Sequence, residues 1–199
     1  MTHSHPPSRA HAHRTSTGLD SRKMAFWAFI GSECLLFGSL ISTYLVYKGR
    51  SVVGPYPHDI LNIPFTSVST FDLLMSSLMM VLALAAVQRG DLKWAKVWLV
   101  ATALLGILFL SGQVYEFTSF VHEGLTLQTN LFGATFFVLT GTHGAHVTVG
   151  VIWLLTLWVR ALQGKVTAAN AVTVEICGLY WHFVDVIWIV IFTVVYLIQ

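Results

Sequence analysis

Residues 174–198, VEICGLYWHFVDVIWIVIFTVVYLI, combine a long apolar run with two ionisable side chains in its interior. A helix needs about 20 apolar residues to cross a hydrocarbon core about 30 Å thick, and this stretch is longer than that. His182 and Asp185 are three residues apart, so on a helix their side chains share one face. The stretch predicts a membrane-spanning helix that must accommodate two polar groups.

The composition of the whole chain agrees with a membrane protein. Of 199 residues, 55% are hydrophobic and only 10% are charged, and the mean hydropathy is +0.71. An ordinary soluble domain has roughly 25% charged residues. A net charge of +2, without a basic run interleaved with aromatic residues, excludes a nucleic-acid partner.

Five segments are long and apolar enough to span the membrane, which predicts an all-α polytopic bundle. The polar residues before the first span form a flexible tail, 1–23, whose histidines lack the constraints of a specific metal site. Cys34 and Cys177 fall in the spans, where we expect small buried packing residues rather than a disulfide. The predicted spans are 24–47, 65–87, 94–121, 131–159 and 174–198.

Basic residues set the predicted orientation, because they are retained on the cytoplasmic side. Nine of the eleven Lys and Arg residues lie in the N-terminal tail and in the turns after the second and fourth spans. Lys48 and Arg50 lie on the other side. We therefore expect a cytoplasmic N-terminus and, after five crossings, a C-terminus outside.

Ionisable side chains within the spans need a partner, neutralisation or a purpose, since a charge at the centre of a membrane helix costs roughly 2.5–3.5 kcal/mol. Asp72 and Glu116 are expected nearer the outer ends of their spans, where this cost is smaller. The five residues expected deeper are Glu33, His143, His146, His182 and Asp185.

Helix geometry predicts which of these groups share a depth. With a rise of about 1.5 Å per residue, Glu33 and Asp185 both lie roughly 13–16 Å from the cytoplasmic edge. If the first and fifth spans touch, Glu33 would meet His182 or Asp185, whereas the histidines of the fourth span would lie deeper.

Three interpretations of these polar groups stay open on residue chemistry. An HxxH pair, His143 and His146, together with His182 and Asp185 has the donors of a zinc or iron site. The absence of the ExxH pattern of bundle di-iron sites argues against it. A proton relay is the second interpretation, and hydrogen-bonded helix packing or lipid-headgroup contact, which we favour, is the third. No nucleophile elbow, phosphate loop or haem-attachment motif occurs, so we expect no catalytic residue.

Four separated motifs resemble one family, and they occur in the family's order. They are AFIGSECLLFGSLISTYLVY in the first span, VYEF followed by HEG after the third, FFVLTGTHGAHVTVGVIW in the fourth and YWHFVDVIWIVIFTVVYL in the fifth. Together they resemble subunit III of haem-copper respiratory oxidases. The chain is similar to the short five-helix bacterial form, which lacks the first two helices of the seven-helix form.

The resemblance implies a subunit without redox cofactors in a bacterial inner membrane. Its direct partner would be subunit I, which holds the haems and copper, with subunit II and in some complexes subunit IV nearby. The family's buried carboxylate falls on Glu33, its histidines fall on His143, His146 and His182, and Asp185 belongs to the same terminal motif.

The resemblance also implies roles for the bundle. Family members hold phospholipids in a cleft between the first two of the five helices and the other three, assist access of O₂ and sustain proton uptake by subunit I. Tyr180, Trp181, Trp188 and Glu116 are candidates for lipid contact or packing. The expected function is a non-catalytic subunit of a proton-pumping cytochrome c oxidase. A quinol oxidase is the alternative donor class, and an independent proton channel or transporter is the alternative from another class.

Overall fold

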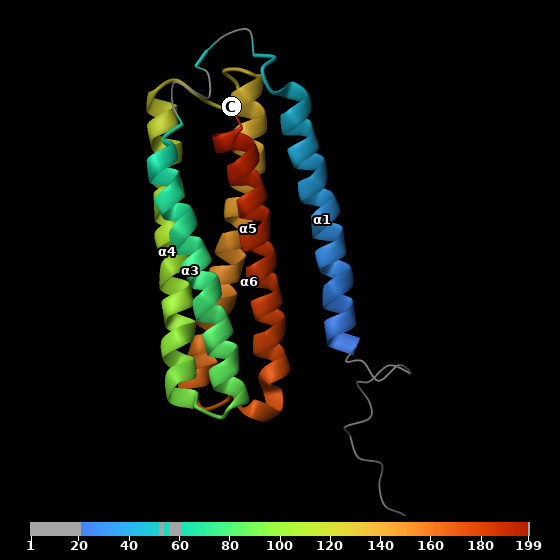
Figure 1. The fold of residues 1–199 in the computed structure, drawn as a ribbon, viewed down its shortest axis with the longest axis vertical. Helices are drawn as coiled ribbons and strands as arrows, with labels where there is room; N and C mark the ends of the chain where they lie inside the picture. The colour runs from blue at the N-terminus through green and yellow to red at the C-terminus, as the bar shows by residue number, and fades with distance from the viewer. Residues whose placement is uncertain (1–20, 52–53, 56–60, 199) are drawn as a thin grey trace, which may run out of the picture.

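The computed structural model describes residues 21–51, 54–55 and 61–198, and its long elements are all helices (Figure 1). All five predicted spans are present, each within a few residues of its predicted bounds. The long helices are α1 (Ser21–Tyr47), α3 (Ile63–Gln88), α4 (Leu92–His122), α5 (Leu131–Leu162) and α6 (Ala171–Phe192). A short 3₁₀ turn, η2 (Ala168–Asn170), precedes α6, and a π-helical turn, η3 (Thr193–Leu197), follows it.

Local sequence signals account for the helix ends. The side chains of Asn62, Asp91 and Asn130 each accept a hydrogen bond from the backbone three residues later, which caps α3, α4 and α5. Gly90 follows α3 with a φ of 77°, a left-handed conformation that favours glycine. The helices therefore begin and end where short polar turns satisfy their free backbone groups.

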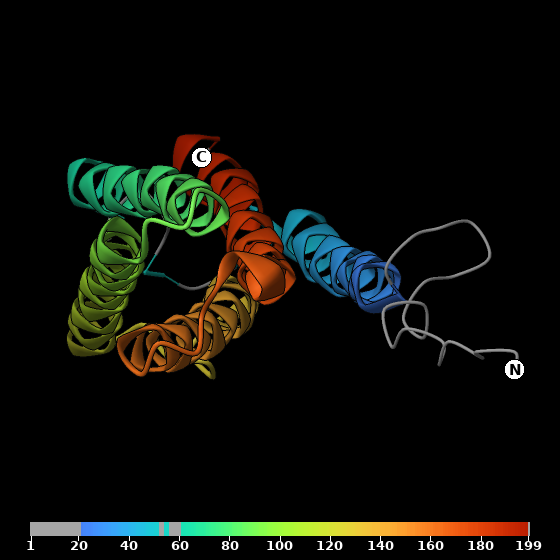
Figure 2. The ribbon, with the colours of Figure 1, turned by 90° about the horizontal axis from the view of Figure 1, so that it is seen from below.

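Four of the helices form a closed ring, and α1 lies outside it. In the view along the bundle, α3, α4, α5 and α6 surround a common centre, whereas α1 stands beside α5 and α6 (Figure 2). The expected division between the first two helices and the other three is wrong, because α3 packs extensively on α4 and on α6. The division in the structure separates α1 alone from the ring.

Trp181 occupies the centre of the ring and contacts the three other helices. Its indole nitrogen donates to the Ser76 hydroxyl of α3 at 2.8 Å, and the ring is fully buried. A Cβ added at Gly106 of α4 or at Gly150 of α5 would lie 2.6 Å and 2.8 Å from atoms of the indole. The large side chain of α6 thus fits only because both facing positions are glycine.

Trp188 repeats this arrangement two turns further along α6. Its indole nitrogen donates to the Thr70 hydroxyl of α3 at 2.9 Å. The ring packs edge-on against Phe109 of α4 and stacks on His143 of α5, with centroid distances of 4.8 Å and 4.9 Å. Both tryptophans therefore join α6 to all three other helices of the ring, and neither lies on the outer surface.

The outlying helix α1 is held by a narrow apolar stripe and by polar contacts at its ends. Its buried residues Ile30, Phe37 and Tyr44 recur every seven positions, and most of its other side chains are exposed. At one end Lys23 Nζ lies 2.6 Å from Glu175 Oε1 of α6. At the other end Lys48 donates to the carbonyl oxygens of Val194 and Ile198, and partial burial lowers the pKa of its ammonium group.

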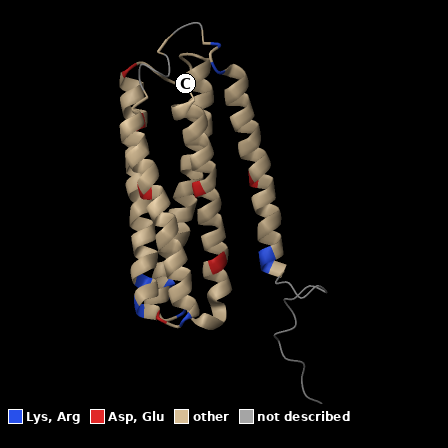
Figure 3. Cartoon of the chain, viewed as in Figure 1, with Lys and Arg blue, Asp and Glu red and all other residues tan. Residues whose placement is uncertain are grey.

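The described Lys and Arg residues gather at the two ends of the helices, as expected for membrane spans (Figure 3). Most of the described Lys and Arg residues lie at the end that carries the start of α1 and the α3–α4 and α5–α6 turns (Figure 3). Of the predicted tail, residues 1–20 lie outside the described residues, and 21–23 form the first turn of α1.

One expectation about a single residue is wrong. Cys34 is exposed on α1, because this helix buries only one stripe, whereas Cys177 is buried as expected. Asp72 lies nine residues after the start of α3, because this helix begins at Ile63, two residues before the predicted start of the span.

The fit around Trp181 makes a direct prediction. Gly150→Ala adds a methyl group that overlaps a fully buried ring, so we expect the free energy of unfolding to fall by about 1–3 kcal/mol, as in other overpacked cores. Gly141→Ala on the same helix is the matched control, because its added Cβ would lie 4.0 Å from the nearest atom. Thermal unfolding in detergent, followed by tryptophan fluorescence, would contradict this packing if the two variants were equally stable.

Candidate functional site

A cavity of about 530 Å³ lies between α1 and the ring. Most of its lining is apolar, and its polar residues are Glu33 of α1 and His146 of α5. The side chains of these two residues are only 15% and 20% exposed. The residues that line the cavity are Phe26, Phe29, Glu33, Ala145, His146, Val149, Trp153 and Tyr180.

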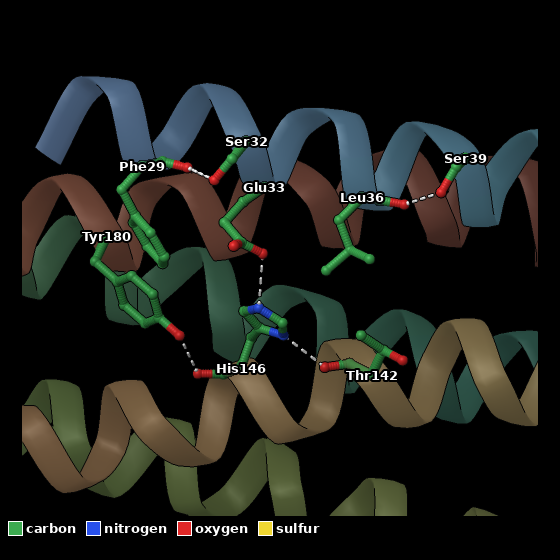
Figure 4. A network of polar contacts seen from close by, with 8 residues as sticks. All are labelled: Phe29, Ser32, Glu33, Leu36, Ser39, Thr142, His146 and Tyr180. Atoms are coloured by element: carbon green, nitrogen blue, oxygen red, sulfur yellow. Dashed lines mark hydrogen bonds and ion pairs between the residues drawn. The ribbon is translucent and has the colours of Figure 1, made fainter.

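Glu33 and His146 form the polar contact across this cavity. Glu33 Oε2 lies 3.1 Å from His146 Nε2, and the Tyr180 hydroxyl donates to the backbone carbonyl of His146 at 2.9 Å (Figure 4). The sequence instead predicts His182 or Asp185 on the last helix as the partner of Glu33. That expectation is wrong, because α1 packs more extensively on α5 than on α6, and the Glu33 side chain meets His146 of α5 instead.

The hydrogen bonds of His146 determine how many protons the pair holds. His146 Nδ1 lies 2.8 Å from the carbonyl oxygen of Thr142, which can only accept, so Nδ1 carries a hydrogen. The contact between Nε2 and Oε2 then needs one further proton, on either atom. Carboxylic acid with imidazole and carboxylate with imidazolium are both neutral overall. The pair therefore places a polar contact in the membrane without a net charge.

His143 lies on α5 one turn before His146 but in a different environment. Its side chain is fully buried inside the ring, between Phe37, Phe109 and Trp188, and neither ring nitrogen has a hydrogen-bond partner among the described residues. The two histidines of the HxxH pair thus face the ring interior and the α1 cavity respectively.

His182 and Asp185 lie at the contact between α6 and α3. His182 Nδ1 lies 2.6 Å from the Ser77 hydroxyl. Asp185 is 3% exposed and lies beside Ser77, but neither of its oxygens makes a hydrogen bond with another described residue. These residues belong to a different helix contact from Glu33 and His146.

Glu116 forms a third polar contact, near the opposite end of α4 from the basic turns. It is 6% exposed, accepts a hydrogen bond from the Thr66 hydroxyl of α3 at 2.5 Å and lies beside Tyr196 of η3. The contact ties α3 and α4 to the last turn of the chain.

The ionisable groups of the spans are therefore distributed over separate helix contacts. In the described part of the chain, no three His, Cys, Asp or Glu side chains come close enough to hold a metal ion together. The partners that sequence reasoning missed are mostly hydroxyls, those of Thr66, Thr70, Ser76 and Ser77 on α3. Ser and Thr within an apolar span are a general signal of hydrogen bonds between membrane helices.

Comparison with known proteins gives matches along almost the whole chain. Residues 7–199 match the family described as "Cytochrome c oxidase subunit III". The chain is 42% identical to "Cytochrome c oxidase subunit 3" of Bacillus sp. (strain PS3), over 87% of this chain and 84% of the relative. It is 40% identical to "Quinol oxidase subunit 3" of Bacillus subtilis (strain 168), over 87% and 85%. It is 38% identical to "Cytochrome bo(3) ubiquinol oxidase subunit 3" of Pseudomonas putida, over 88% and 84%.

The extent of these matches, together with five membrane-spanning helices, agrees with the resemblance drawn from the four motifs. The chain belongs to the cytochrome c oxidase subunit III family, whose members are subunits of haem-copper oxidases.

Proposed function

We propose that this chain is the non-catalytic, cofactor-free subunit III of a proton-pumping terminal oxidase that reduces O₂ to water. In this role it binds subunit I directly, stabilises it, holds phospholipid and assists O₂ access and sustained proton uptake. Haems and copper belong to the partner subunits, with subunit II and, where present, subunit IV in the same complex. Family membership along the chain supports the assignment.

The cavity between α1 and the ring is the observation that carries the lipid-binding part of the proposal. Its volume of about 530 Å³ lies in the usual range of ligand sites, and its walls are mostly aromatic and aliphatic. A neutral Glu33–His146 pair does not repel an acyl chain, and apolar O₂ partitions into the same environment. The cavity therefore suits a phospholipid tail that enters from the membrane.

The polar residues of the spans have structural roles in this proposal. Glu33 and His146 fix α1 on α5, and His182 with Asp185 anchors α6 on α3 through Ser77. Glu116 fixes α4 on α3. Each hydrogen bond between membrane helices contributes about 1–2 kcal/mol or less to stability, so each of these contacts adjusts the packing of two helices by a small amount.

The electron donor in the proposal is cytochrome c, and a quinol is the alternative. Relatives of similar identity carry both names, so this chain's similarity does not separate them. Either donor would bind on other subunits. The basic end of the bundle supports a cytoplasmic N-terminus in a bacterial cell membrane and a C-terminus outside.

An independent proton channel or transporter is the rival from another class, and purification separates the two. In mild detergent, we expect the natural chain to migrate with subunits I and II and with a haem absorbance spectrum. Identification of the co-migrating chains by mass spectrometry completes the test. A chain that purified alone and without haem, from cells that make the other subunits, would contradict the oxidase assignment.

Substitution of the Glu33–His146 pair tests whether it is structural. Glu33→Gln keeps a donor for His146 Nε2 and an uncharged pair, so we expect oxidase turnover and proton pumping near normal. His146→Leu leaves Glu33 without its partner in the cavity, so we expect weaker retention of subunit III during purification. A large loss of proton pumping in Glu33→Gln, measured in proteoliposomes, would instead indicate a proton relay.

A bulky side chain in the cavity tests lipid binding. Ala145→Phe fills space among the lining residues, so we expect fewer phospholipids per complex in native mass spectrometry. Val138→Phe is the matched control on the same helix, because Val138 is exposed and does not line the cavity. Equal phospholipid content in the two variants would show that the cavity is not a lipid site.

A further inference from the structure

Asp72 is an intramembrane carboxylate to which the described part of the chain supplies no partner. It lies nine residues after α3 begins at Ile63, which is about 14 Å along the helix axis. Its side chain is partly exposed, and it makes no hydrogen bond or ion pair with any described residue. A carboxylate on the surface at this depth faces hydrocarbon unless another molecule covers it.

The other acidic side chains in the interior of the spans either have a hydrogen-bond partner or are enclosed by protein. Glu33 pairs with His146, and Glu116 accepts a hydrogen bond from Thr66. Asp185 has no hydrogen bond but is 3% exposed and thus enclosed by protein. Asp72 alone among these described residues is both without a partner and open to the outside.

Asp72 lies in an apolar surface formed by α3 and α4. Ser69 of α3 faces Gly112 of α4, and because the helices are antiparallel, Asp72 is level with residues 108–109 of α4. We call this surface the α3–α4 face and define it by Asp72 and four exposed neighbours. The neighbours are Val68, Phe71, Leu108 and Tyr115, with exposed fractions of 63%, 59%, 52% and 66%.

Lipid is a poor cover for this face. Acyl chains have no hydrogen-bond donor, and an aspartate side chain is too short to extend from this depth to the headgroup region, unlike lysine or arginine. A donor carried by a neighbouring membrane helix reaches the carboxylate directly. A basic side chain also neutralises its charge, and the surrounding apolar side chains would pack against the same helix.

We propose that the α3–α4 face is the docking surface for a membrane helix of another oxidase subunit, which presents a basic side chain to Asp72. The inference rests on the proposed function, since it assumes a multisubunit complex, and it adds where that complex is joined. It differs from the lipid cavity, which lies on the other side of the ring between α1, α5 and α6.

Substitution of Asp72 tests the charge. In the purified complex, Asp72→Asn and Asp72→Leu should each lower the number of subunit III copies per haem by about tenfold under a mild salt and detergent wash. Asp72→Glu should retain subunit III better than either, because it keeps the charge. Near-normal retention of subunit III in both Asp72→Asn and Asp72→Leu would overturn the proposal.

Photo-crosslinking in the complex with native Asp72 locates the face independently of folding effects. A benzophenone amino acid at position 68 or 108 should link to another oxidase subunit. The same probe at position 35 of α1, where Leu35 is 77% exposed, is the comparison. Crosslinks to lipid alone from 68 and 108, with a subunit captured from 35, would overturn the docking face but leave the proposed function intact. Absence of haem and of every other oxidase subunit from the preparation would overturn the proposed function itself.

Discussion

The insertion of Trp181 between two glycines is the constraint on which the ring of helices depends. A hydrophobic force between helices is nearly absent in lipid, so close packing and hydrogen bonds must hold them together. Trp181 supplies both, because its ring fills the space left by Gly106 and Gly150 while its nitrogen bonds Ser76. One side chain thereby fixes the distance and the rotation of α6 relative to α3, α4 and α5.

The weak attachment of α1 follows from the same physics. This helix has no tryptophan inserted between glycines of the ring, and it is held by a narrow stripe of buried residues and by polar contacts that include those of Lys23, Glu33 and Lys48. Such an attachment leaves space for the cavity beside α5 and α6. The four helices of the ring thus pack closely around Trp181 and Trp188. Packing between α1 and the ring is sparse, and this is where lipid would enter.

The sequence allowed much of the fold to be predicted but little of the polar pairing. Length and apolarity located every span, because crossing a hydrocarbon core imposes a minimum length that few soluble helices meet. The predicted partner of Glu33 was wrong. Counting residues along each span estimates the depth of a side chain, but it does not show which faces of two helices contact each other. His143 and His146 belong to the same motif, yet His143 is buried among aromatic rings and His146 faces α1.

By itself, the sequence determined that this protein spans a membrane five times and that it belongs with subunit III of the haem-copper oxidases. Those conclusions rest on the length of the apolar segments and on short motifs. Both are local properties that can be read directly from consecutive residues. Only the tertiary structure decided that α1 stands outside a four-helix ring, that Glu33 meets His146, and that Asp72 is left facing outward. These depend on the rotation of each helix about its own axis, which is set by contacts between positions far apart in the chain, such as Trp181 of α6 against Gly106 and Gly150.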